Sequence, residues 1–126
     1  MIDRKQPSFD LEERTFEFAK NVRLILKLLS PTIANQEDSR QLVRSSGSAG
    51  ANYIESVESL SQKDKLMRLK IVRKESKESF YWFRLIKESN DFEEDLWNDW
   101  NYLMDEADQL KKIFSKMILK LEENPK

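Results

Sequence analysis

Long apolar stripes with helical spacing are the feature that most constrains this chain. The clearest stripe begins at Leu96 and continues to Leu121 in steps of three and four residues, the spacing that places side chains on one face of an α-helix. Its members are Leu96, Trp100, Leu103, Ala107, Leu110, Phe114, Met117 and Leu121. A stripe of this length predicts a long helix that buries one face against neighbouring helices.

Three earlier segments carry stripes of the same kind. The predicted helices span residues 10–29, 36–58, 62–88 and 92–122. Their predicted inward residues are Leu11, Thr15, Phe18, Val22, Ile25 and Leu29, then Leu42, Ser46, Ala49, Tyr53 and Val57, then Leu66, Leu69, Val72, Ser76, Phe80, Phe83 and Ile86. Short connectors between four such helices predict an antiparallel up-and-down bundle.

Local signals set the expected helix ends. Pro31 should end the first helix, because the residue before a proline resists the α conformation. Asn35 is expected to cap the second helix, and Ser61 the third, because short polar side chains accept hydrogen bonds from the free N–H groups of a first turn.

The composition agrees with an all-α fold. The 126 residues fit one domain, expected to span 1–126, and 39% hydrophobic beside 36% charged residues suits helices with one dry face. Only two glycines and three prolines leave few tight turns, which argues against an all-β chain.

The missing residue types exclude several kinds of chemistry. The chain has no cysteine and no histidine, so it has neither a thiolate nor an imidazole for metal binding or catalysis. A carboxylate di-metal enzyme is the remaining enzyme hypothesis, from Glu75, Glu78, Glu93 and Glu94, but the bundle pattern for such a centre requires Glu-x-x-His. We therefore expect no enzymatic activity, no cofactor, no bound metal and no small-molecule substrate.

No segment indicates a membrane location. Residues 1–7 lack the apolar core of a signal peptide, and no run approaches the ~18 apolar residues of a membrane span. The sequence predicts a cytoplasmic protein without a membrane partner.

The segment from Arg44 to Glu55 contains both glycines, and a helix or a loop can account for it. A glycine inside a helix costs roughly 1 kcal/mol relative to alanine, which favours a loop. The apolar register nevertheless continues from Leu42 to Val57 without a shift, so we predict a helix. Small residues spaced by four would let another helix approach closely. These close-packing residues are Ser46, Gly47, Gly50 and Ala51.

A polar stripe runs along the same helix through Arg44, Ser48, Asn52 and Glu55. We expect Asn52 and Glu55 to bond a cation of a neighbouring helix or subunit, and a ligand site is the alternative.

The first half of the third helix is rich in cations. They are Lys63, Lys65, Arg68, Lys70, Arg73, Lys74 and Lys77. The formal net charge is −1, so any attraction to RNA or DNA must come from such a local patch. Antiparallel packing would bring these residues beside the lysines at the end of the fourth helix. The competing interpretation is a solvated surface with ion pairs one helical turn apart.

Aromatic residues gather around the turn between the third and fourth helices. Most are expected in the core, but Trp82, Trp97 and Tyr102 lie off the apolar stripes and are candidates for a protein interface.

With these motifs in place, the chain resembles the bacterial four helix bundle protein family, also called the 23S rRNA intervening-sequence-encoded proteins. The resemblance covers nearly the whole chain and is most specific in three segments, residues 44–55, 60–64 and 70–79. It implies an antiparallel four-helix bundle that assembles as a homopentamer, in which Arg44, Asn52, Glu55 and Glu78 occupy characteristic polar positions.

The resemblance also implies a function class. No enzymatic activity is established for the family, and association with ribosomal RNA or other nucleic acid is suggested by the location of its genes. The chain is also similar to the accessory variability proteins of diversity-generating retroelements, which are basic pentameric bundles, but it departs from them in its net charge of −1.

Two hypotheses therefore remain open. The first is a non-enzymatic homo-oligomeric bundle that acts as an assembly module and binds RNA or DNA through its basic residues. The second is an adaptor ring that binds a partner polypeptide through aromatic and acidic surfaces, with no nucleic acid.

Overall fold

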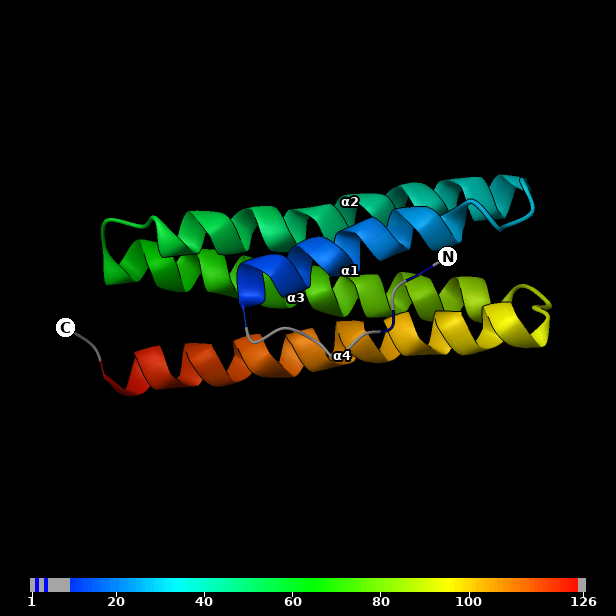
Figure 1. Ribbon diagram of the computed structural model, residues 1–126. Coiled ribbons are helices and arrows are strands. Elements are labelled where there is room, and N and C mark those ends of the chain that lie inside the picture. The colour runs from blue at the N-terminus through cyan, green and yellow to red at the C-terminus, as the bar shows by residue number, and fades with distance from the viewer. Residues whose placement is uncertain (1, 3, 5–9, 125–126) are drawn as a thin grey trace.

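The computed structural model describes residues 2, 4 and 10–124. It contains four α-helices, which are α1 (Leu11–Leu26), α2 (Ile33–Val57), α3 (Gln62–Glu88) and α4 (Glu94–Glu123). Consecutive helices run in opposite directions, and each helix packs against two others, α1 against α2 and α4, and α3 against α2 and α4 (Figure 1). The described residues form no strand, so the prediction of an all-α, four-helix protein is confirmed.

The observed helix ends differ from the expected ones by two or more residues at three places. α1 ends at Leu26 instead of 29, because the next turn tightens into bonds such as that from Leu28 N to Ile25 O (3.1 Å). α2 begins at Ile33, three residues early, since Thr32 is its cap and its hydroxyl accepts from Asn35 N. α4 begins at Glu94, two residues later than expected.

The Asn35 prediction was therefore wrong, because this side chain has other partners. Its amide donates to Ser30 O (3.0 Å) and to Asn90 Oδ1 (2.8 Å), so it ties the α1–α2 connector to the α3–α4 connector. The Ser61 cap is confirmed, as its hydroxyl accepts from Asp64 N at 3.0 Å.

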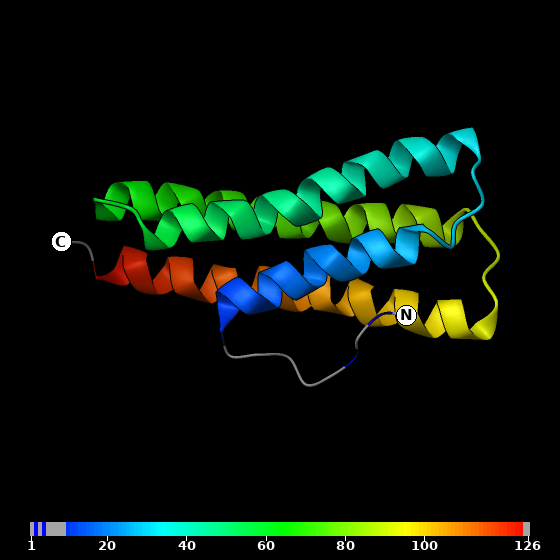
Figure 2. The ribbon, with the colours of Figure 1, turned by 45° about the horizontal axis from the view of Figure 1, so that its top comes forward.

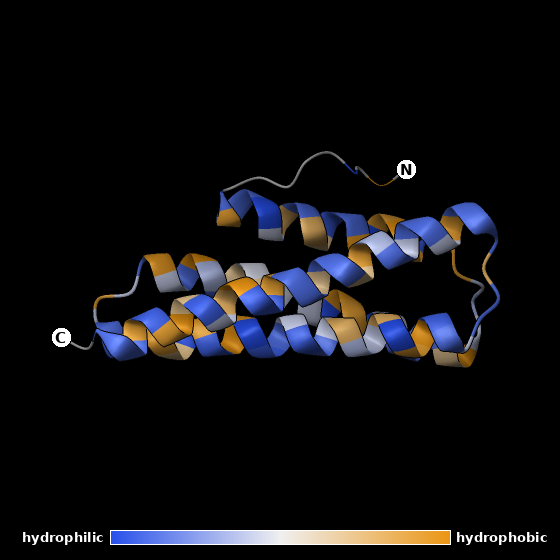
Figure 3. Cartoon of the chain, turned by 90° about the horizontal axis from the view of Figure 1, so that it is seen from below, coloured by the Kyte–Doolittle hydropathy of each residue, from blue (hydrophilic) through white to orange (hydrophobic). Residues whose placement is uncertain are grey.

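The core follows the predicted stripes closely. Trp100, Phe18, Phe83 and Phe114 are its largest fully buried side chains, and the Trp100 indole donates to Phe83 O at 2.8 Å. The edge of the Phe83 ring meets Trp100 at a centroid distance of 5.1 Å. Hydrophobic and hydrophilic residues alternate along every helix, as expected for amphipathic helices (Figure 3).

One predicted core residue lies outside the core. Val57 is 53% exposed, because α1 is the shortest helix and covers only part of the length of α2 (Figure 2). Thr15, in the second turn of α1, lies against Gly50, so the last turn of α2 extends past the start of α1. Val57 therefore has no α1 side chain to pack against.

A partly buried ion pair joins α1 to α4. Arg14 donates to both carboxylate oxygens of Glu106, at 2.7 and 2.8 Å, and each side chain is almost nine-tenths buried. This bond raises the pKa of Arg14. The pair fixes the level of α1 along α4, because a charge left without its partner at this depth is costly.

None of the helices, over the residues that the structure describes, combines the length and apolar character required to cross a membrane.

Candidate functional site

One flank of α2 carries a polar network that joins it to α3. Arg44 binds two acids one helical turn apart, with Arg44 Nη1 3.2 Å from Glu75 Oε2 and Arg44 Nη2 2.8 Å from Glu78 Oε1. Glu75 is only 5% exposed, whereas about half of the Arg44 side chain is exposed. The hydrogen bond with Glu75 raises the pKa of Arg44, with smaller contributions from the charges of Glu75 and Glu78.

The network continues along the polar stripe. Ser48 donates to Glu75 Oε2 at 3.2 Å, and the Asn52 amide donates to Ser48 O and Oγ. The Asn52 carbonyl oxygen accepts from Arg68 of α3 at 3.0 Å. Asn52 thus bonds a cation of a neighbouring helix, whereas Glu55 is exposed on the outer side of α2.

Two members of this flank were missed in the sequence. Glu75 and Ser79 are buried, and the Ser79 hydroxyl lies 2.8 Å from that of Ser45. Arg68, Val72, Glu75 and Ser79 form their own stripe with steps of four, three and four. That spacing could have indicated that Glu75 and Ser79 are buried. The stripe mixes polar and apolar residues, however, so hydrophobic periodicity does not identify it as a buried face.

The opposite flank of α2 carries the small residues. Ser46 is fully buried, and a Cβ atom on Gly50 would lie 3.2 Å from Thr15 Oγ1 and 3.8 Å from the Thr15 backbone carbon. Gly47 differs, because its added Cβ would meet only the terminal nitrogen of Arg23, at 3.2 Å. Ala51 is exposed. Ser46 and Gly50 therefore face the protein's own core and α1, whereas Gly47 and Ala51 lie toward solvent.

An open groove follows this flank between α1 and α2. In one part, Phe16, Ala19, Gly47, Ala51 and Ile54 form the floor and walls of a cavity of about 460 Å³. Asp10, Glu12 and Glu13 stand at its edge, at the start of α1.

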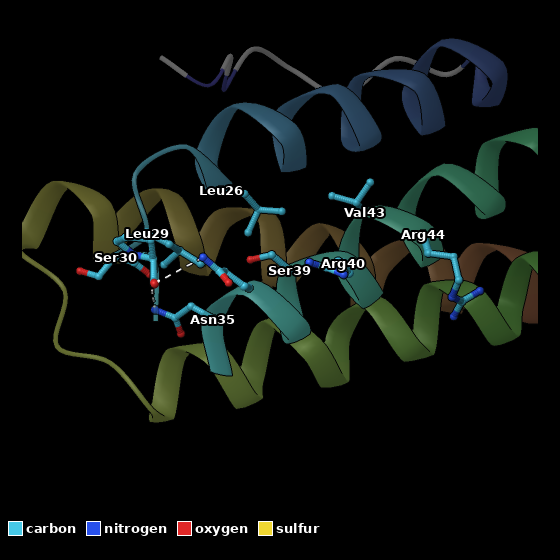
Figure 4. Close-up of a pocket in the computed structure, with 10 residues that line it drawn as sticks. Leu26, Leu29, Ser30, Asn35, Ser39, Arg40, Val43 and Arg44 are labelled. Carbon is cyan, nitrogen blue, oxygen red and sulfur yellow. Dashed lines mark hydrogen bonds between the residues drawn. The ribbon is translucent and has the colours of Figure 1, made fainter. Parts of the chain in front are cut away.

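A second part of the groove lies near the α1–α2 connector, with a volume of about 530 Å³. Figure 4 shows Leu26 of α1 and Val43 of α2 on its two sides, with Ser39 and Arg40 along α2. These two cavities, which together we call the α1–α2 groove, follow the same pair of helices, and the end of the Arg23 side chain lies beside Gly47. The cavity at the start of α1 is edged by acids, and the cavity near the connector is edged by Arg40 and Arg44.

The structure divides the seven predicted cations of α3 among different surroundings. Arg68 faces α2 and belongs to the Asn52 network, and Lys65 is half-buried. Lys70 forms an ion pair with Glu122 of α4 at 3.3 Å, so it lies on the α4 flank. Arg73 and Lys77 follow one and two turns later on that flank. Lys63 and Lys74 are exposed on the outer side of α3, where they border a shallow groove with Met67.

The off-stripe aromatic residues are partly exposed. The Tyr81 and Trp82 rings meet edge to face with centroids 4.9 Å apart, and the Lys87 ammonium lies 4.4 Å from the centroid of Trp97. Arg4 lies 5.9 Å from the Tyr102 ring. Each ring therefore already has a partner within the chain.

The acids do not converge as metal ligands do. No group of three or more Asp or Glu side chains within the described part of the chain is placed to hold a metal ion. Glu75 and Glu78 instead accept hydrogen bonds from Arg44, which fits a role in joining helices.

The sequence profile of the 23S rRNA-intervening sequence protein family matches residues 8–116. The chain belongs to that family. The match confirms the resemblance drawn from residues 44–55, 60–64 and 70–79, all of which lie within it. The relation to accessory variability proteins stays a prediction.

A solved structure supports the fold. The chain is similar to a crystal structure of a protein of unknown function from the S23 ribosomal protein family of Bacteroides thetaiotaomicron, with a TM-score of 0.72 and 24% identity. The match covers 86% of this chain and 97% of the other. At this identity the similarity shows the fold alone. Among functionally curated proteins, no match is found.

Proposed function

We propose that this protein is a non-enzymatic, cytoplasmic, homo-oligomeric bundle that binds the phosphate backbone of RNA or DNA. Membership of the 23S rRNA-intervening sequence protein family supports an association with ribosomal RNA, and the family resemblance supports a ring of five subunits. The binding surface is the outer face of the α3–α4 pair, which we call the α3–α4 basic surface and define as Lys70, Arg73, Lys77, Lys111 and Lys112.

The observation that carries the proposal is an excess of cations over carboxylates on this surface. Lys70 pairs with Glu122, while Lys111 and Lys112 share Asp108 at 3.3 and 2.9 Å. Arg73 and Lys77 form no ion pair with any residue that the structure describes. The five cations thus have two carboxylate partners, and the charge of Asp105 also acts on Lys112. The remaining positive charge is available to phosphates.

The antiparallel register brings the two helices' cations together. Trp100 of α4 lies against Phe83 of α3, and Glu122 of α4 reaches Lys70 of α3. The α4 residues between these points run beside the intervening part of α3, so Lys111 and Lys112 lie at the level of the Arg73–Lys77 turn. Repetition of this surface around an oligomer would add the weak fields of single subunits.

The test is binding of labelled RNA fragments from the ends of a 23S rRNA intervening sequence, measured by fluorescence anisotropy at ~50 and ~200 mM salt. Arg73→Glu with Lys77→Glu should weaken binding at least about tenfold at the lower salt and reduce the salt slope by about 1.5, because two phosphate contacts are lost. Arg68 is left intact, since its bond to Asn52 holds α2 and α3 together.

The matched control is Lys27→Glu with Arg40→Glu, which changes the net charge equally at exposed positions near α1 and on α2, away from the α3–α4 basic surface. It should bind with no more than about a twofold loss, because exposed charges beyond a Debye length are largely screened. An equal loss in both variants, or binding that does not respond to salt, would remove the nucleic-acid part of the proposal. The alternative, an adaptor for a partner polypeptide, would then take precedence through exposed rings such as Tyr81 and Trp97.

A further inference from the structure

We propose that the α1–α2 groove of one subunit receives the outer face of α3 from a second copy of this chain. The inference rests on the self-assembly in the proposed function and assigns its interface. The inserted surface, called the α3 outer stripe, consists of Lys63, Met67, Ile71, Lys74 and Tyr81.

The groove has the shape that a helix requires. Gly47 and Ala51 are four residues apart on α2, Ala51 exposed and Gly47 half-buried beside the flexible end of Arg23. Their small size lets the backbone of another helix come close once the Arg23 side chain moves aside. Phe16 is 59% exposed and Ile54 is 43% exposed, so the groove leaves large apolar side chains in water. Burial of such a lined groove under an amphipathic helix is a common mode of recognition.

The α3 outer stripe has the matching chemistry. Met67 is 47% exposed on α3, beside the half-buried Ile71, and Lys63 and Lys74 stand at either end of the same shallow groove. Lys70, at the edge of the α3–α4 basic surface, lines the same groove, so three lysines around an exposed methionine provide an apolar ridge with a positive edge. The α1–α2 groove presents the reverse, an apolar floor edged by Glu12 and Glu13.

Helix direction brings the opposite charges together. α1 and α3 run the same way in this bundle (Figure 1). Rotation about an axis along the bundle preserves helix direction, so the α3 of a second copy would also run parallel to α1. Its basic first half would then meet the acidic start of α1, without any change of orientation.

The spacing along the two surfaces also agrees. Met67 and Tyr81 are 14 residues apart, and so are Arg40 and Ile54 on α2, which gives each pair an axial separation of about 21 Å. If Met67 lies over Ile54, the Tyr81 ring, which is 56% exposed, reaches the level of the exposed Arg40 guanidinium. A cation facing an aromatic ring at this point would be favourable.

The two surfaces are different, so the contact is heterologous. Each copy offers a groove on α1 and α2 and a ridge on α3, and repetition of one such contact generates a ring when the rotation closes. A symmetric dimer that joined two grooves with their helices parallel would place the acids of both copies against each other, which like-charge repulsion disfavours. An antiparallel dimer of two grooves would leave the α3 outer stripe of both copies uncovered.

Engineered cysteines test the contact directly, because the chain has no native cysteine. Ile54→Cys and Met67→Cys, which face each other in this register, should form disulfide-linked chains under mild oxidation when both are in one chain, seen as a ladder on a denaturing gel. Either substitution alone should leave monomers. The control pairs Ile54→Cys with Lys116→Cys on the exposed side of α4, and should give no ladder.

Light scattering of the unmodified protein separates the possible failures. If the protein is an oligomer but the Ile54–Met67 pair does not cross-link, or Ile54→Cys alone cross-links, this interface is wrong while self-assembly stands. If the protein is a monomer at all accessible concentrations, self-assembly and this interface both fail, and RNA binding is judged by its own test.

Charge reversal gives an independent test. Glu12→Lys with Glu13→Lys should lower the apparent association constant about tenfold, and so should Lys63→Glu with Lys74→Glu. All four substitutions in one chain should restore association, because the two charge patterns are then exchanged. Failure of the fourfold variant to recover, with its melting temperature kept, would overturn the proposal.

Discussion

The two flanks of α2 each pack against a neighbouring helix, but they do so through different kinds of contact. On the α3 flank, Arg44, Ser48 and Asn52 make side-chain hydrogen bonds to an acid or an arginine of the facing helix. On the α1 flank, Gly50 brings Thr15 into direct contact with the α2 backbone. The α3 flank therefore depends on the presence of hydrogen-bond partners, and the α1 flank depends on the small size of the residue at the contact.

This difference determines what each flank tolerates. A polar contact is damaged when one member is removed, because the remaining group loses its hydrogen-bond partner. A close helix contact is damaged when atoms are added, because a packed core does not expand freely. Substitutions of opposite kinds should therefore separate the two flanks.

The largest effect is expected for Gly50→Leu. Even a single Cβ would approach Thr15 to 3.2 Å, and the remaining side-chain atoms would displace α1 from α2. We expect a loss of about 3 kcal/mol in the free energy of unfolding, measured by urea denaturation, together with a change in oligomer size. An unchanged midpoint and an unchanged size would refute the role of Gly50 in close packing.

On the polar flank, Glu75→Ala should cost about 1–2 kcal/mol in the same measurement, because Ser48 loses its acceptor and Arg44 keeps only one of its two acids, Glu78. Glu78→Ala is the matched control. Glu78 is partly exposed and bonds Arg44 alone, so its removal should cost less than about 1 kcal/mol. Equal costs for the two variants would show that burial does not distinguish these acids.

The two glycines should respond to alanine with opposite signs. Gly47→Ala should stabilise the protein by about 0.5 kcal/mol, because alanine favours the helix and its Cβ meets only the flexible end of Arg23. Gly50→Ala should destabilise it by about 1 kcal/mol, because its Cβ meets the hydroxyl and backbone of Thr15. Thermal unfolding of both variants measures the difference, and shifts in the same direction would contradict the assignment of the two faces.

The smallest expected effect is a loss of stability at alkaline pH that comes from Tyr53 on the α1 flank. Desolvation first, and then the charges of Asp10 and Glu12, raises the pKa of Tyr53 above its ordinary value of 10.0. A raised folded-state pKa means that folding favours the neutral phenol, so this contribution is fully present below about pH 10 and is lost as pH rises through the folded-state pKa.

The measurement is urea unfolding of the unmodified protein and Tyr53→Phe over this alkaline range. The stability of the unmodified protein relative to the variant should fall as the phenol ionises. Arg44, whose pKa is raised by Glu75, stays charged over this range. The Arg44 contacts on the α3 flank should therefore not change with pH, in contrast to Tyr53 on the α1 flank. A constant difference between the two proteins would show that Tyr53 ionises equally easily in the folded and unfolded chains.

Much of this architecture was predictable from periodicity. The stripe from Leu96 to Leu121 predicted α4 to within two residues at each end, and the cap at Ser61 placed the start of α3 correctly. The continuous register from Leu42 onward predicted that both glycines lie within a helix, which the structure confirms. These features follow from local geometry, because the spacing of apolar residues along a helix does not depend on which neighbour covers them.

The partners of polar residues were harder to predict. Arg68 resembled one more surface cation in the sequence, but its bond to Asn52 removes it from the exposed set. Glu75 and Ser79 resembled a solvated face, although both are buried against α2. Which charged side chain meets a partner depends on the axial position and rotation of one helix relative to the next. Neither quantity can be derived from the spacing of apolar residues within a single helix.

By itself, the sequence determined that this chain forms four amphipathic helices, where they turn, and which chemistries are excluded by the absence of cysteine and histidine. The tertiary structure decided that Thr15 of the same chain occupies the space beside Gly50, while Gly47 and Ala51 line an open groove. The reason is the short length of α1 and its position along the axis of α2. α1 covers only part of α2, and this contact alone determines which small residues are buried within the subunit and which face outward.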